Sequence, residues 1–185
     1  MNDTHSALER AYAHALAWLD SVPRRAVPAT VSAEQLLSSL DGRLPDDPAD
    51  PAYVVDALAA AAEPGLVATP SGRFFGFVVG GTLPAALAAD WLTTAWDQNA
   101  AFAMLAPAEA AVEAVAARWL LDLFGLPARA SVGFVTGCAG ANFTCLAAAR
   151  HRVLAAAGWN VEADGLQGAP KITIIATQDR HVSVD

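Results

Sequence analysis

The last third of the chain alternates between apolar segments and one long helix, which restricts the fold to the α/β class. The run 131–135 is short and apolar, and 171–177 is apolar and rich in β-branched residues, so both are predicted to be buried strands. Between them lie a glycine-containing turn and a helix predicted over residues 141–157. This order is one βαβ unit. Two strands are too few for a stable parallel sheet, so we expect an incomplete α/β domain.

Residues 1–65 are predicted to form a helical amino-terminal arm that precedes this domain. An apolar stripe at helical spacing over residues 7–22 predicts an amphipathic helix. The capping-box pattern of Ser32 and Gln35 comes before a second, short helix. A polar connector rich in proline then leads to a third helix, which begins at Pro51. The arm carries little sign of a compact core of its own.

Residues 66–185 are assigned to the first part of the α/β domain. The segment 71–81 is aromatic and rich in glycine, and it fits neither the helical nor the strand period. Helices are predicted at 84–96 and 107–124. The second has a proline at its start and a glycine and a proline beyond its end, so its limits are well defined.

The composition indicates that much apolar surface needs to be covered. The chain is 55% hydrophobic and 16% charged, whereas typical domains are about 45–50% apolar and about 25% charged. The excess is buried either in an unusually apolar fold or in a larger assembly. A formal net charge of −8 argues against nucleic acid as a partner, because phosphate backbones are bound by clustered positive charge.

No segment has the pattern of a targeting or membrane-spanning sequence. The first ten residues are polar and of mixed charge, and the longest uncharged run, 74–89, is short for a bilayer and contains glycines and a proline. Cys138 and Cys145 have no second pair, which favours neither a zinc site nor a disulfide framework. We therefore expect a cytoplasmic protein with no metal and no membrane contact.

Three features are candidates for a functional site. The turn 137–140 has small residues at the start of a helix, where backbone N–H groups and the helix dipole favour an anion. His181 follows the second predicted strand, at the edge where open α/β sheets bind ligands. Each has a simpler alternative, an ordinary tight connection and a surface histidine respectively. The aromatic segment 74–81 suits either a substrate entrance or packing between subunits.

Several short motifs occur in one order within residues 50–185. They are Arg-Phe-Phe-Gly-Phe-Val-Val-Gly-Gly at 73–81, Asp-Gln-Asn at 97–99, Ala-Pro-Ala-Glu at 106–109, Gly-Phe-Val-Thr-Gly-Cys-Ala-Gly-Ala-Asn at 133–142 and His-Val-Ser at 181–183. This order resembles that of the group II pyridoxal-phosphate-dependent decarboxylases, which include the aromatic-amino-acid and glutamate decarboxylases. The order of the motifs is more specific than any one of them alone.

The resemblance implies a particular fold, cofactor and assembly. The fold would be the large domain of the aspartate-aminotransferase type, fold type I, in an obligate homodimer whose amino-terminal helices wrap around the partner. The cofactor would be pyridoxal 5'-phosphate, and the small-molecule substrate an amino acid that loses carbon dioxide while the cofactor serves as an electron sink.

The resemblance also implies roles for individual residues. His181 would stack on the pyridine ring of the cofactor and act in catalysis. The substrate entrance would be formed by the segment from Phe77 to Gly80. Backbone groups at the start of a helix would bind the cofactor phosphate, namely those of Gly137, Cys138 and Ala139.

Two departures from the family pattern bear on activity. The family has a hydroxyl side chain where this sequence has Ala139 and an acid where it has Gly140, and the missing hydroxyl removes a hydrogen bond worth about 1.5–3 kcal/mol to a charged acceptor. Lys171 is the only lysine in the sequence, whereas the family's cofactor-binding lysine comes far downstream. We therefore expect the amino-terminal part of a decarboxylase, which needs a complementing carboxy-terminal half.

Two alternatives remain at the level of the sequence. One is another enzyme of fold type I, such as an aminotransferase. The other is a helical interaction module that is not an enzyme and contains an incidental βαβ unit. The motifs do not specify which amino acid is the substrate.

Overall fold

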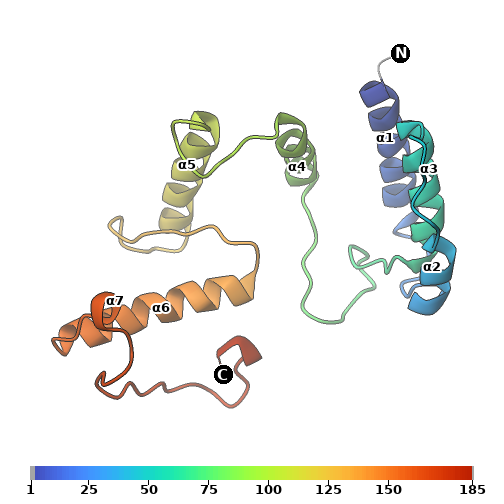
Figure 1. Ribbon diagram of the computed structural model, residues 1–185. Coiled ribbons are helices and arrows are strands. Elements are labelled where there is room, and N and C mark those ends of the chain that lie inside the picture. The colour runs from blue at the N-terminus through green and yellow to red at the C-terminus, as the bar shows by residue number, and fades with distance from the viewer. Residues whose placement is uncertain (1–2, 185) are drawn as a thin grey trace. The chain divides into compact units, whose positions relative to one another are not determined.

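The computed structural model describes residues 3–184, and these residues form helices but no strand (Figure 1). Helices make up 54% of the described residues. The predicted α/β fold of the aspartate-aminotransferase type is therefore wrong for this structure, which is all-helical. The expected helices outside the βαβ unit are present.

The two predicted strands, 131–135 and 171–177, are irregular and largely exposed. Ile174 and Ile175 are 61% and 95% exposed, and Lys171 lies on the surface rather than at the start of a buried strand. A β-branched sequence forms a strand when neighbouring strands pair with its backbone and cover its faces. Within residues 3–184 no neighbouring strand pairs with either segment, so both remain irregular despite their apolar sequences.

The helices belong to two compact units, Met1–Asp97 and Gln98–Asp185. The first unit contains α1 (Asp3–Ser21), α2 (Ala33–Leu40), α3 (Pro51–Ala62), the 3-10 turn η1 (Glu63–Gly65) and α4 (Pro84–Trp96). The second contains α5 (Pro107–Leu123), α6 (Cys138–Ala156), α7 (Val161–Asp164) and the 3-10 turn η2 (Val182–Val184).

Local sequence signals set the helix starts in the first unit, as predicted. The Ser32 hydroxyl accepts a hydrogen bond from the Gln35 N–H at 3.2 Å, and the Gln35 side chain accepts one from the Ser32 N–H at 2.8 Å. Asp50 caps α3 by accepting from the Tyr53 N–H at 2.9 Å, and Pro51 occupies the first helical position. These contacts satisfy N–H groups that lack partners within the helix.

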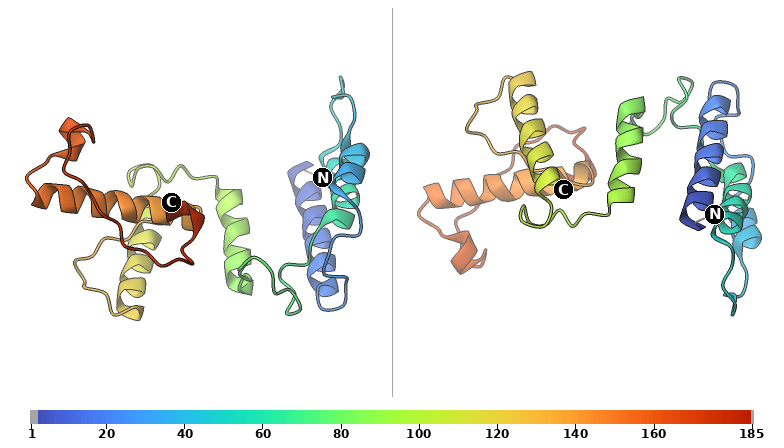
Figure 2. Two further views of the ribbon diagram at one scale, coloured as in Figure 1. Left: turned by 90° about the horizontal axis from the view of Figure 1, so that it is seen from below. Right: turned by 90° about the horizontal axis from the view of Figure 1, so that it is seen from above.

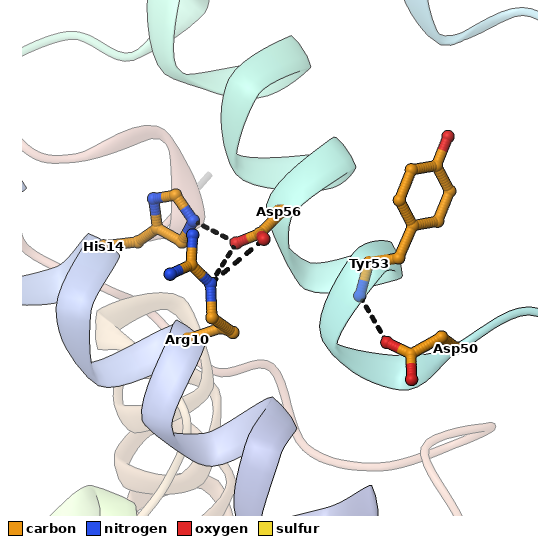
Figure 3. Close-up of polar contacts among 5 residues, drawn as sticks. All are labelled: Arg10, His14, Asp50, Tyr53 and Asp56. Carbon is orange, nitrogen blue, oxygen red and sulfur yellow. Dashed lines mark hydrogen bonds and ion pairs between the residues drawn. The ribbon is translucent and has the colours of Figure 1, made fainter.

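Helices α1 and α3 lie side by side and run in the same direction (Figure 1 and Figure 2). Arg10 and His14 of α1 contact Asp56 of α3, and Arg25, which follows α1, contacts Glu63, so the contacts advance along both helices together. Figure 3 shows Arg10 Nε and His14 Nε2 directed at the Asp56 carboxylate, each 2.7 Å from Oδ1. Hydrogen bonds from Arg10 and then His14 lower the pKa of Asp56.

The lowered pKa of Asp56 predicts an acid-sensitive contact between α1 and α3. Because folding lowers this pKa from its ordinary value of 3.8, the stabilisation is complete above that value and is lost as the pH falls through the folded-state pKa. We expect Asp56→Asn to lower the melting temperature of the helices slightly at neutral pH, and to have no effect in strong acid. Circular dichroism melts at both pH values check this.

Asp46→Asn is the matched control, because Asp46 is 79% exposed and pairs only locally with Arg43. Its melting temperature should follow that of the unmodified chain at both pH values, since exposed pairs contribute little. An equal loss of stability from Asp56→Asn at neutral and strongly acidic pH would contradict the charged contact.

Few apolar side chains are buried among residues 3–184. Large apolar side chains of α5 are open to solvent, with Trp119 at 72% and Leu123 at 75% exposure. Within the described residues, no helix has the length and apolarity needed to cross a bilayer. The buried hydrophobic residues are Val22, Ala68, Ala106, Leu121, Leu154 and Val161.

Candidate functional site

The start of α6 contains the predicted phosphate-binding residues. The helix begins at Cys138, three residues earlier than expected, so the turn 137–140 is mostly its first helical turn. Gly137 is the N-cap residue with an extended backbone and no side-chain hydrogen bond to the helix, and the space around its α-carbon is open. The N–H groups of the first turn have no acceptor within the helix. They are therefore suited to an anion.

The predicted ring-binding residue His181 is linked to the same helix through Ser183. The Ser183 hydroxyl oxygen lies 2.7 Å from His181 Nδ1 and accepts a hydrogen bond from the Asn142 side-chain amide at 2.8 Å. Asn142 lies on the second turn of α6, and Ser183 lies in η2. The structure therefore connects the helix that begins at Cys138 with the loop that carries His181.

These contacts determine the tautomer of the His181 ring. The Ser183 backbone N–H donates to His181 Nδ1 at 3.1 Å, and a backbone N–H is only ever a donor, so Nδ1 carries the lone pair. The Ser183 hydroxyl receives its own hydrogen bond from Asn142 and has its proton free to donate to Nδ1 as well. These contacts match the neutral tautomer that carries its proton on Nε2, and the imidazole is exposed.

An open groove of about 490 Å³ lies beside Ser183, between α6 and the irregular segment 172–174. Its walls are mostly apolar. Arg150 contributes the charged group of the lining, and its Nε atom is buried with no hydrogen-bond partner among the described residues. The apolar residues of the groove are Phe143, Leu146, Ala147, Ala149, Val153, Ile172 and Ile174.

The predicted entrance residues Phe77 and Gly80 belong to the first unit, whereas Cys138, Ala139 and His181 belong to the second. Phe77 is 94% exposed and has a positive φ of 57°, and nothing lies within 4 Å of where a side chain at Gly80 would begin. Each group of residues is therefore accessible within its own unit.

Other chemistries have little support in the described part of the chain. Cys138 and Cys145 are both exposed and unbonded. No group of three or more histidine, cysteine or acidic side chains is arranged to hold a metal ion within residues 3–184.

The chain belongs to the pyridoxal-dependent decarboxylase family, group II. Residues 33–185 match the model of the pyridoxal-dependent decarboxylase conserved domain, which covers most of the 185 residues. This confirms the resemblance inferred from the motifs. Members of this family use pyridoxal phosphate. No curated protein matches the sequence.

Two residues of this site, Asn142 and Ser183, are not among the candidates that the sequence indicates. Both were visible in the motifs, because Asn142 ends the motif 133–142 and Ser183 ends the motif 181–183. Their direct hydrogen bond gives a physical reason why the two motifs occur in one chain. Spacing along the sequence could not show it, since the two residues are 41 positions apart.

Proposed function

We propose that this chain provides the cofactor-phosphate and ring contacts of a pyridoxal-phosphate-dependent amino-acid decarboxylase. The observation that carries the proposal is the hydrogen-bonded connection from Asn142 through Ser183 to His181. It ties the anion-suited start of α6 to an oriented, exposed imidazole in a chain of the decarboxylase family.

The donors at the start of α6 fit a phosphate group. The backbone N–H groups of Cys138 and Ala139 are in the first helical turn, and Gly137 leaves open space in front of them. Ala139 and Gly140 add no side-chain donor, so this part of the site relies on the backbone and on the helix dipole. We expect phosphate affinity to be lower than with a hydroxyl residue at position 139.

His181 is proposed to orient the substrate. A flat imidazole held through Nδ1 is suited to stack on a planar ring, and its Nε2 proton is free to donate to a substrate carboxylate. When bound, pyridoxal phosphate supplies the electron sink for the loss of carbon dioxide. Holding the bond that breaks in the right direction lowers the barrier rather than only tightening binding.

The proposed partners are an amino-acid substrate, a second copy of the chain and a carboxy-terminal polypeptide that provides the cofactor-binding lysine. The apolar stripe of α1 favours the second copy, because Leu8 is 52% and Tyr12 is 55% exposed. Lys171, the only lysine in the sequence, is exposed in an irregular segment.

A complementation assay tests the proposed function. The chain is mixed with the carboxy-terminal half of a family member, pyridoxal phosphate and a panel of amino acids, and the products are measured. Release of carbon dioxide with formation of an amine supports the decarboxylase. A keto acid without carbon dioxide would indicate an aminotransferase, and neither product would favour a module that is not an enzyme.

The chain alone is expected to form no specific covalent bond with pyridoxal phosphate. Lys171 is surface-exposed and lies in the segment 171–177, which has no regular structure, so no packing presents its amine to the cofactor. Borohydride reduction of the mixture followed by peptide mapping should show only weak, scattered labelling. A single stoichiometric label on Lys171 would contradict this expectation.

A further inference from the structure

Arg73 fastens the aromatic segment 74–79 to the end of α1. Its Nη2 atom donates to the carbonyl oxygen of Arg25 at 2.6 Å and to that of Val22 at 3.3 Å. Both carbonyls lie beyond the last residue of α1, Ser21, on the side where the helix dipole favours a cation. The guanidinium therefore holds two points of the amino-terminal arm with one side chain.

The residues just before Arg73 form a firm base for the segment. Ala68 is fully buried, and its N–H donates to the Val27 carbonyl at 2.9 Å. Ser71 is 6% exposed; its carbonyl accepts from the Phe74 N–H at 3.0 Å and its hydroxyl accepts from the Arg73 N–H at 3.2 Å. The chain is thus anchored up to residue 74.

Beyond this base, the segment projects into solvent in a strained conformation. Phe75, Phe77 and Val78 are 93%, 94% and 104% exposed. Phe77 and Val78 have φ angles of 57° and 54°, in the left-handed region that is unfavourable for bulky and β-branched residues. Such strain persists only where the adjoining structure fixes the backbone. Here the backbone is fixed by the hydrogen bonds of Ser71 and by those of the Arg73 side chain.

We propose that Arg73 is a positioning residue for the substrate entrance. By binding the carbonyls of Val22 and Arg25, it sets the direction in which Phe77 and Val78 leave the arm. This inference rests on the proposed function and on the substrate entrance that the family resemblance implies for the segment from Phe77 to Gly80. The side chain that orients the entrance is thus a charged one that does not belong to the site at the start of α6.

The test compares Arg73→Gln and Arg73→Lys with the unmodified chain by hydrogen exchange. Glutamine removes the charge and the fork of donors, whereas lysine keeps one charged donor. We expect the hydrogen-bonded amides of Ser71, Arg73 and Phe74 to exchange about tenfold faster in Arg73→Gln, as the loss of one charge-assisted hydrogen bond implies. Arg73→Lys should restore part of the protection. Arg43→Gln, which loses only an exposed contact with Asp46, is the control.

The second measurement uses the complemented enzyme. If Arg73→Gln changes the direction of the segment that carries Phe77 and Val78, KM for the amino acid should rise severalfold while kcat stays nearly unchanged. Arg73→Lys should be intermediate. Unchanged exchange in Arg73→Gln, or faster exchange with an unchanged KM, would overturn the role of Arg73. Absence of decarboxylation in every version, the unmodified one included, would instead overturn the proposed function and the entrance role with it, while exchange still shows whether Arg73 fixes the segment.

Discussion

Replacing His181 with alanine should reduce turnover by about 100-fold in the complemented enzyme, the loss typical of a misoriented reacting group. The ring is exposed, and its Nδ1 is held by the Ser183 hydroxyl at 2.7 Å. Replacing His181 with alanine therefore removes few packing contacts, but it removes the ring proposed to stack on the cofactor and its Nε2–H donor. Because orientation acts in the transition state, kcat should fall more than KM rises. Turnover and melting temperature measured together check this.

Neighbouring residues provide the controls for His181. Gln178→Ala and Asp179→Ala alter exposed side chains of the same loop and should cost little. Ser183→Ala keeps the imidazole but removes its hydroxyl contact and the link to Asn142, so we expect an intermediate loss of turnover. Equal, mild effects of His181→Ala and the two loop controls would make His181 an ordinary surface histidine.

The isolated chain should bind a hydrophobic dye strongly or aggregate. Trp119, Val112 and Leu123 of α5 are between 69% and 75% exposed, and further apolar residues are exposed on the other long helices. Monomeric soluble proteins rarely expose apolar patches larger than a few hundred Å², so this surface is expected to attract dye and other chains. Dye fluorescence and light scattering as a function of concentration measure the effect.

A polar substitution on α5 tests where the dye binds. Trp119→Gln should lower the dye signal because Trp119, with Ala111, Val112, Val115 and Ala116, lines a shallow apolar hollow. Asp46→Asn, in the polar connector, should leave the signal unchanged. A monodisperse monomer that unfolds cooperatively and binds no dye would contradict the expectation and favour the self-contained module.

The helices were predictable because their signals are local. The capping box of Ser32 and Gln35 and the Asp50 cap before Pro51 each act within four residues, so the sequence alone determines them. The start of α6 was placed too late because Gly137 and Gly140 suggested a turn, whereas the structure accommodates Gly140 inside the helix. A helix interior tolerates one glycine at a modest cost.

The strands and the polar site depended on distant parts of the chain. The segments 131–135 and 171–177 have strand-like sequences, but strands also need pairing partners, which a pattern within seven residues does not specify. For the site, the sequence indicated Cys138, Ala139 and His181 through the family resemblance. The contact of Asn142 with Ser183 required the fold, because no sequence pattern predicts a hydrogen bond between residues 41 positions apart in two separate elements.

The single hydrogen bond between Asn142 and Ser183 closes a loop of 41 residues. Closing a loop of that size costs chain entropy that grows with the logarithm of its length, and little else in η2 is buried to offset it. The orientation of His181 is therefore expected to be among the least stable features of the molecule. Mild denaturant should release the imidazole while α6 remains helical, so that the orientation of His181 and the helix content are separable properties of this chain.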